Sequence, residues 1–324
     1  MKKFFALLLV CVLAISLAAC GGTGDGGGTS SETVRLNMAT GGTGGTYYPL
    51  GGAMAVVINN NTAIEMTSMS SGASADNIRQ IGRGDADVAI VQNDVMSYAF
   101  NGTGTWVDSE TINNMGTLMS LYPETVQIIV LANSDIHSVE DLRGKRVSIG
   151  DVGSGVEANA TQVLAAYGLT RDDIRVENLA FNPSADLMRD MNLDAFFVTA
   201  ATPNTAVMEL STSRELRLLN LSDGAMTQLQ RDYPFYVRVT VTSDDYSFLS
   251  EPVQTLAVQA TLIASTDTVS EQAGYDIVKA LIENAADIGH ARGAYINAEN
   301  AVKSISVDFH PGARLYFQEI GVLD

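Results

Sequence analysis

The sequence predicts an α/β protein of two domains built on a mainly parallel β-sheet. Two observations carry this prediction: short apolar runs alternate with helical stretches, and about 290 residues remain after an N-terminal export signal and a short tether. That length is more than one ordinary domain needs and is comfortable for two. A hydrophobic content of 46% is enough to build their cores. Strands that alternate with helices favour a parallel sheet.

Hydrophobic periodicity places the individual elements. The first strand is expected at 34–39, where apolar and polar residues alternate, and a helix begins at Ala53 and runs to Asn59. Buried strands are expected at Val88–Val91, Gln127–Leu131, Arg146–Ile149 and Ala195–Val198. Helices are expected at Val95–Phe100, Ala158–Tyr167 and Glu271–Ala286. Ligands of such sheets bind outside the carboxyl ends of the strands, so the loops at these ends hold the candidate site.

A turn rich in Gly and Thr, TGGTGGTYYPLG at 40–51, connects the first strand to its helix. Glycines let the backbone approach a ligand, and the hydroxyls and the helix N-terminus add donors where negative charge is favoured. The turn lacks both the P-loop pattern and the G-x-G-x-x-G spacing, so we expect a small anion rather than a nucleotide phosphate. A turn without a ligand is the alternative. The candidate binding residues are Thr40, Gly42, Thr43, Gly45, Thr46 and Tyr47.

A second glycine turn, at Gly153, Ser154 and Gly155, follows the strand expected at 146–149 and opens the next helix. It repeats the chemistry of the first turn, and two such turns fit a clamp that holds an anion from both sides. Residues 153–158 also fit the G-x-G-x-x-A form of a dinucleotide turn, with Glu177 about 20 residues later. An exported dinucleotide-binding or hydrolytic enzyme is therefore the competing hypothesis.

Other candidate ligand-binding residues lie beside the remaining strands, each with a structural alternative. Ser74 and Asn77 lie at a predicted helix start, where Ser74 could instead cap the helix. Gln92 and Asp94 follow the strand at 88–91; Asp94 could accept from a ligand ammonium group or cap the next helix. After the strand at 195–198 come three further candidates, which plain turn chemistry also explains: Thr199, Thr202 and Pro203.

The N-terminus has the pattern of a bacterial lipoprotein signal. Residues 1–20 comprise a basic start, an apolar stretch and the segment Leu-Ala-Ala-Cys, which ends at Cys20, the expected site of lipidation. Residues 21–32 are rich in Gly and Ser and are expected to be a flexible tether. The chain after residue 20 carries 17 basic and 37 acidic residues, a net charge of −20, which argues against a nucleic-acid partner. We expect a protein outside the cytoplasm, anchored by lipid to the cell membrane.

Catalytic and metal chemistry are not expected. The three histidines, His137, His290 and His310, lie far apart and lack a second ligand at metal spacing. Position 152 is Val, so Ser154 does not have the frame of a hydrolase nucleophile. His310 is expected to support a turn with Pro311 and Gly312. We therefore expect no catalytic residue, no metal and no cofactor.

The chain resembles the TAXI-type solute-binding proteins of TRAP transporters from about Arg35 to Gly321. The resemblance rests most on the turn at 40–51 and on the segment HPGA at 310–313. It is further carried by segments at 72–77 (GASADN), 84–94 (GDADVAIVQND), 141–147 (DLRGKRV), 153–155 (GSG), 194–197 (DAFF) and 233–236 (YPFY).

The resemblance implies a two-lobed periplasmic-binding-protein fold of type II, with the ligand cleft between the lobes. It also implies a monomer that captures a small carboxylate or amino acid, glutamate-like as the first expectation, and delivers it to TRAP permease subunits in the membrane. The first lobe is expected at 33–127 plus 240–324 and the second at 128–239. A ligand-sensing lipoprotein that partners a receptor kinase is a further alternative. Three alanines depart from the family pattern near the expected cleft: Ala73, Ala200 and Ala201.

Overall fold

The computed structural model describes residues 33–324, which form one compact unit. The expected export signal, the lipidated Cys20 and the tether at 21–32 lie outside the described residues. No helix in the described range is long and apolar enough to cross a membrane. The strands are β1 (Val34–Ala39), β2 (Ile64–Met69), β3 (Val88–Gln92), β4 (Met115–Leu131), β5 (Arg146–Ser148), β6 (Arg175–Glu177), β7 (Ala195–Ala200), β8 (Leu216–Leu218), β9 (Val237–Val241) and β10 (Val253–Ser265). The helices are α2 (Tyr47–Asn61), α3 (Ser74–Arg83), α4 (Asn93–Asn101), α5 (Gly155–Ala166), α6 (Phe181–Arg189), α7 (Thr205–Ser211), α8 (Asp223–Asp232), α9 (Glu271–Glu283), α10 (Ala298–Ala301) and α11 (Pro311–Glu319).

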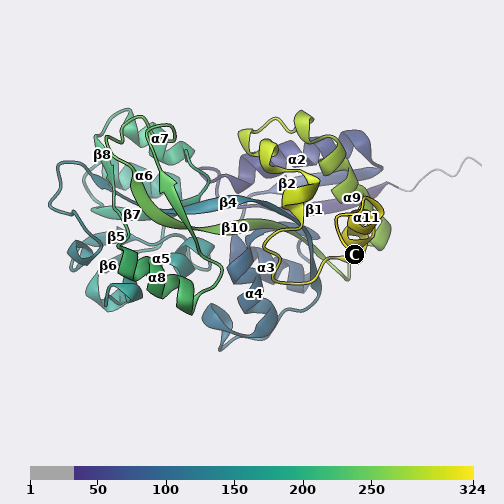
Figure 1. Cartoon of the computed structure of the whole chain (residues 1–324), viewed down its shortest axis with the longest axis horizontal. Helices are drawn as coiled ribbons and strands as arrows, with labels where there is room; N and C mark the ends of the chain where they lie inside the picture. The colour runs from purple at the N-terminus through teal and green to yellow at the C-terminus, as the bar shows by residue number, and fades with distance from the viewer. Residues whose placement is uncertain (1–32) are drawn as a thin grey trace, which may run out of the picture. The chain divides into compact units, whose positions relative to one another are not determined.

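The strands form one ten-stranded sheet in the order β2-β1-β3-β10-β4-β7-β5-β6, with β8 paired to β4 and β9 to β10 (Figure 1). Strand β1 pairs in parallel with β2 and β3, and β5 pairs in parallel with β6 and β7. The two long strands β4 and β10 pair antiparallel with each other and with their outer neighbours. The fold is α/β as predicted, but the prediction of a mainly parallel sheet is wrong at its centre. Apolar composition marks a buried strand without indicating its direction.

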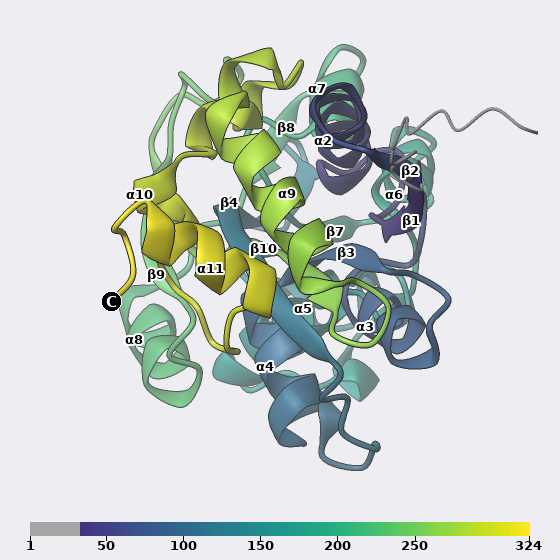
Figure 2. The ribbon, with the colours of Figure 1, turned by 90° about the vertical axis from the view of Figure 1, so that its right-hand side faces the viewer.

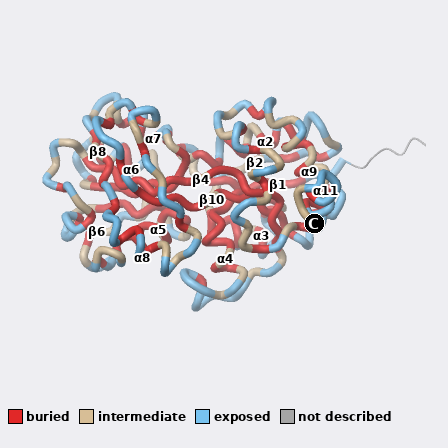
Figure 3. The backbone as a smooth tube through the Cα atoms, in the orientation of Figure 1, coloured by how far each residue is buried: buried red, intermediate tan, exposed pale blue. Residues whose placement is uncertain are grey.

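Helices cover both faces of the sheet in each half of the molecule, as the alternation of side chains along single strands shows. In β3, Val88 and Ile90 pack with α2 and α9, whereas the residues between them pack with α3 and α4 on the other face. In β7, Phe197 packs with α5 and α8, and Phe196 and Val198 pack with α6 and α7. The buried chain in Figure 3 therefore follows the strands, and exposure is concentrated in the outer helices and loops.

The C-terminal helices close one end of the first half. Helices α9 and α11 lie side by side, with α2 beside α9 (Figure 2). His310 stands at the start of α11, where its Nδ1 accepts from the Gly312 N–H and its Nε2 lies 3.0 Å from the Val269 carbonyl oxygen. This position agrees with the predicted turn support at His310. Burial lowers the pKa of this imidazole, so it stays neutral near pH 7.

Most predicted elements exist, with shifted ends. The helix expected at Ala53 begins at Tyr47, because the turn residues 47–52 are already helical. The strand expected at Gln127–Leu131 is the last part of the 17-residue strand β4. The helix expected to reach Ala286 ends at Glu283, and a short 3-10 turn follows it. Helix α5 begins at Gly155, so both glycine turns lead directly into helices.

Candidate functional site

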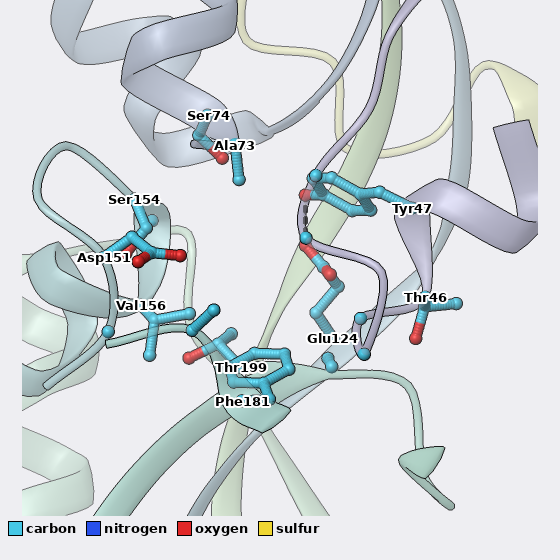
Figure 4. Close-up of a pocket in the computed structure, with 18 of the residues that line it drawn as sticks. Thr46, Tyr47, Ala73, Ser74, Glu124, Asp151, Ser154, Val156, Phe181 and Thr199 are labelled. Carbon is cyan, nitrogen blue, oxygen red and sulfur yellow. Dashed lines mark hydrogen bonds between the residues drawn. The ribbon is translucent and has the colours of Figure 1, made fainter. Parts of the chain in front are cut away.

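A small cavity lies where the loops after β1, β2, β5 and β6 and the ends of β3 and β7 meet the middle of β4 (Figure 4). It measures about 60 Å³, room for the centres of only a few water molecules. Its position at the carboxyl ends of the parallel strands is where α/β sheets bind ligands. The wall consists of Gly41, Gly42, Gly44, Gly45, Thr46, Tyr47, Ala73, Ser74, Gln92, Glu124, Gly150, Asp151, Ser154, Gly155, Val156, Leu179, Ala180, Phe181, Thr199 and Ala200.

The structure brings both glycine turns to this cavity. Among the residues proposed from the sequence, those in the wall are Gly42, Gly45, Thr46, Tyr47, Ser74, Gln92, Ser154, Gly155 and Thr199. Those placed outside the wall are Thr40, Thr43, Asn77, Asp94, Gly153, Thr202 and Pro203. The predicted residues in the wall lie at helix starts and strand ends, whereas most of those outside the wall hold these segments in place.

Five helices begin at the cavity. The residues that precede their first turns, Thr46 of α2, Ala73 of α3, Gln92 of α4, Ser154 of α5 and Ala180 of α6, all belong to the wall. The first N–H groups of a helix lack intrahelical acceptors and carry a partial positive charge. The cavity therefore favours a negative group even though, within the described part of the chain, no Lys, Arg or His lines it.

The first glycine turn packs tightly against the second half of the molecule. A Cβ atom on Gly44 would overlap the side chain of Asn182, and the Gly44 carbonyl accepts a 3.1 Å hydrogen bond from Nδ2 of Asn204. The Thr40 hydroxyl donates to the Met69 carbonyl at 2.5 Å, and Thr43 is exposed. The absence of a side chain at Gly44 thus serves contact between protein segments as well as access to the cavity.

The second turn presents backbone donors rather than its hydroxyl. Ser154 caps α5 by accepting from the Glu157 N–H at 3.1 Å, and the Gly153 N–H donates to the Glu157 carboxylate at 2.7 Å. Gly155 and Val156 occupy the next two positions, whose N–H groups a helix leaves without intrahelical partners. Both residues line the cavity, so their N–H groups are the donors available to an anion.

The strongest polar feature of the wall is Glu124, which the sequence analysis missed. The Tyr47 hydroxyl donates to Oε2 of Glu124 at 2.6 Å (Figure 4). The Tyr122 hydroxyl lies 3.4 Å from Oε1. Burial raises the pKa of this carboxyl group to about 8, against the opposing effect of the tyrosine hydroxyls. The available signal was a single acidic residue inside the otherwise uncharged run 115–131.

Of the two tyrosines at the start of α2, one lines the cavity and the other is exposed. Tyr47 is 6% exposed and lines the cavity, whereas Tyr48 is 39% exposed. Ser74 does not cap α3 with its side chain; instead its Oγ accepts from the Gln92 N–H at 3.0 Å. This bond joins the start of α3 to the end of β3, so two parts of the wall are fixed to each other.

Two of the polar candidates lie behind the wall. Asn77 donates from Nδ2 to the carbonyls of Thr40 and Ile90, at 2.7 and 2.8 Å, and so joins the ends of β1 and β3. Asp94 is buried in the first turn of α4, where its Oδ2 accepts from Asn159 at 3.1 Å. Burial raises the pKa of Asp94 to about 6. Asp94 thus contacts another part of the protein and not the cavity.

The candidate residues at the end of β7 and directly after it are likewise divided between the cavity wall and its surroundings. Thr199 lines the cavity, and Thr202 lies outside it, where its carbonyl accepts from Arg292. The bond between Thr202 and Pro203 is cis, and Pro203 is exposed. Ala73 and Ala200 are in the wall, as their departure from the family pattern suggested, whereas Ala201 is buried outside it. Ala73 has φ 66° and ψ −156°, a conformation that residues other than glycine adopt only under strain.

Within residues 33–324, no group of three or more His, Cys, Asp or Glu side chains is arranged to hold a metal ion.

The sequence matches the NMT1-like family over residues 38–321. The chain belongs to the NMT1-like family. This is the TAXI-type family of TRAP solute-binding proteins, so the resemblance drawn from the glycine turn and the HPGA segment is confirmed. NMT1-like proteins are extracytoplasmic solute-binding components of transporters and not enzymes. The hypothesis of a dinucleotide-binding or hydrolytic enzyme at Gly153 is therefore wrong.

Solved structures show the same fold at low sequence identity. PhnD1 from Prochlorococcus marinus, in complex with methylphosphonate, is 10% identical with a TM-score of 0.53, covering 82% of this chain and 89% of its own. A structure described as a periplasmic transporter is 14% identical with a TM-score of 0.52, covering 90% and 93%. The NMT1-like chain thus has the predicted type II periplasmic-binding-protein fold.

Proposed function

We propose that this protein is the lipid-anchored receptor of a TRAP transporter, which captures a small carboxylate or amino acid and delivers it to permease subunits in the membrane. The observation that carries the proposal is the convergence of five helix starts on one small cavity. Backbone donors at helix starts bind anions without a cationic side chain. The family supplies the transport role, and glutamate, which the resemblance implies, is among the first ligands to test.

Closure around the ligand is part of the proposal. We place the lobes close to 33–127 plus 240–324 and 128–239. Core packing favours placing the point where the chain returns to the first lobe within β10 rather than at residue 240, because Tyr246 and Leu256 pack with the second half. Contacts between the halves border the cavity: Asn204 holds Gly44, and the Ala75 N–H donates to the Gly153 carbonyl at 3.0 Å. A ligand that binds both glycine turns would favour this closed arrangement by its differential affinity.

Ligand capture is tested by thermal unfolding of the purified full chain with a panel of amino acids, 2-oxo acids and dicarboxylates. A true ligand present at 100 times its Kd stabilises the protein by about 2.7 kcal/mol. Stabilisation by at least one small carboxylate or amino acid is expected. If no member of the panel shifts the transition, binding of this class is excluded and the proposal fails.

Delivery and anchoring need separate tests. Uptake of the identified ligand into vesicles that hold the TRAP permease subunits should require this protein. Cys20→Ser should move the chain from the membrane fraction to the soluble fraction, because the thiol that would carry the lipid is removed. Cys11→Ser is the matched control, since it changes the other cysteine of the same segment and should leave the chain in the membrane fraction. Equal fractionation of both variants would contradict a lipid anchor at Cys20.

A further inference from the structure

The charges of the wall are unusual for a site that binds an anion. Its two ionisable carboxyl groups are Glu124, 2% exposed, and the partly buried Asp151, and no cationic side chain from residues 33–324 accompanies them in the wall. A ligand with a second carboxylate would find no cationic counter-charge in the wall, even with Glu124 protonated and neutral. A ligand with an ammonium group would supply the missing positive charge.

Hydrogen-bond acceptors in the wall also lack donors. Oε1 of Gln92 and Oγ1 of Thr199 are buried and have no hydrogen-bond partner within residues 33–324. Oε1 of Glu124 has only the long 3.4 Å contact with Tyr122. Unpaired buried acceptors are costly, and an ammonium group carries three N–H donors and no acceptor. Glu124 and Thr199 both border the cavity in Figure 4, where the Glu124 carboxyl group is directed toward Tyr47.

The rest of the wall is apolar and close. Ala73, Val156, Phe181 and Ala200 contribute carbon atoms, and the cavity of about 60 Å³ leaves little room beyond a compact ligand. The strained conformation of Ala73 holds a methyl group in this wall where glycine would fit without strain. A charged or long ligand side chain would find neither space nor partner here.

We infer that the ligand is a small α-amino acid with an uncharged, apolar side chain, and that Glu124 receives its ammonium group while the helix starts receive its carboxylate. This inference rests on the proposed function and narrows it, because it favours amino acids of alanine to valine size over glutamate and over dicarboxylates. Glu124 thereby becomes the residue that distinguishes an amino acid from the corresponding 2-oxo acid.

A proton accompanies binding in this arrangement. Three titratable groups act on the pKa of Glu124: the hydroxyls of Tyr47 and Tyr122 lower it, and the charge of Asp94, from behind the wall, raises it. Arg292 acts on Tyr122. Arg292 is the cation among these groups, and within residues 33–324 it makes no hydrogen bond to Glu124. Because burial raises the pKa of the Glu124 carboxyl group to about 8, this group holds a proton at pH 7. An ammonium group beside it lowers that pKa, so the amino acid displaces the proton into solution.

The test compares ligands that differ only at the α-carbon: L-alanine with pyruvate, L-valine with 3-methyl-2-oxobutanoate, and L-glutamate with 2-oxoglutarate. Calorimetry on the purified full chain should show L-alanine or L-valine binding at least about 10-fold tighter than its 2-oxo partner and than L-glutamate. Glu124→Gln should weaken the amino acid by about 30-fold or more and the 2-oxo acid by less than about 3-fold. Asp151→Asn, which changes the other acidic group of the wall, should have the smaller effect on the amino acid.

Proton release provides a second readout. Titrations at pH 7 in two buffers of different ionisation enthalpy should show release of a proton on amino-acid binding to the wild type and none for Glu124→Gln. Tighter binding of 2-oxo acids or dicarboxylates would overturn this inference and leave the proposed function intact. Unchanged amino-acid affinity in Glu124→Gln would overturn the role of Glu124. Failure of every ligand in the panel would overturn the proposed function itself.

Discussion

The Tyr47 hydroxyl donates a 2.6 Å hydrogen bond to Glu124, a residue 77 positions later in the chain. Tyr47 begins α2, directly after the glycine turn, and Glu124 lies in the long central strand β4. The bond therefore fixes the end of the glycine turn to the centre of the sheet, at the wall of the cavity. It is also the shortest hydrogen bond that Glu124 receives, since Tyr122 lies at 3.4 Å.

Tyr47→Phe should destabilise the protein by about 1–2 kcal/mol, because it leaves a buried carboxyl group without its best donor. The pKa of Glu124 should rise further, since in the wild type the Tyr47 hydroxyl lowers it. Urea unfolding of the protein without ligand measures the loss. Tyr48→Phe is the matched control, because Tyr48 is 39% exposed, and it should change stability by less than about 0.5 kcal/mol. Equal effects of the two substitutions would contradict the importance of this bond.

The two buried carboxyl groups predict that stability falls as pH rises above 5. Burial raises the pKa of Glu124 from its ordinary 4.5 to about 8 and that of Asp94 from 3.8 to about 6. At pH values between the pKa of a carboxyl group in the unfolded chain and its pKa in the folded chain, the folded chain binds more protons than the unfolded chain. Their contribution to stability is therefore complete below the unfolded pKa values and is lost as pH rises through the folded ones. The two shifts together correspond to a loss of about 5 kcal/mol between pH 5 and pH 8.5, most of it from Glu124.

Urea unfolding at pH 5, 6.5 and 8.5 measures this slope in the wild type and in Glu124→Gln. The variant should lose much less stability across the range, because its amide does not titrate. His290 and His310, whose pKa values burial lowers, act in the opposite direction up to about pH 6.5. Their contribution is common to both proteins and cancels in the difference. Parallel stability curves for the two proteins would contradict a raised pKa at Glu124.

The sequence was sufficient for features that depend on composition or local periodicity. The strand at 88–91 is apolar at every position because both of its faces are covered, and the glycine turns mark helix starts that lie at the cavity. The direction of β4 and β10 was beyond such patterns, since it depends on how distant segments pair. For the same reason the sequence did not show that Asp94 faces Asn159, which is 65 positions away.

Glu124 illustrates a different limit. A lone acid in an apolar run has no periodic or motif signature, and only the folded chain places it beside Tyr47. Gly44 is similar, because its lack of a side chain is explained by Asn182, which belongs to another part of the fold. Composition thus located the walls of the candidate site, whereas the partner of each polar atom required the tertiary structure.

Ala73→Gly should stabilise the protein even though it removes a methyl group. The conformation at φ 66° and ψ −156° costs a non-glycine residue about 1–3 kcal/mol, and glycine adds about 0.5–1 kcal/mol of unfolded-state entropy. A net gain of about 0.5–2 kcal/mol is expected in urea unfolding. Ala75→Gly, two residues later inside α3, is the control and should lose about 1 kcal/mol. A loss of stability in Ala73→Gly would show that the methyl contacts outweigh the strain.

Two glycines in the first turns of helices provide a sharp test of the cavity wall. A Cβ atom on Gly155 of α5 would overlap Oε1 of Gln92, whereas one on Gly224 of α8 would meet no atom within 4 Å. Gln92 is 2% exposed and lines the cavity, so Gly155→Ala has to displace part of the cavity wall. We expect Gly155→Ala to weaken ligand binding by more than about 10-fold, since about 1.4 kcal/mol of lost contact is sufficient.

Gly224→Ala should leave ligand affinity unchanged and should stabilise the protein by about 0.5–1 kcal/mol, because alanine loses less backbone entropy on folding. Calorimetry with the ligand identified by thermal unfolding, together with urea unfolding of both variants, separates the two effects. Gly155→Ala should remain folded, since Gly155 has an ordinary helical conformation that alanine adopts without strain. Full ligand affinity in folded Gly155→Ala would mean that Gln92 and the start of α5 do not form the binding wall.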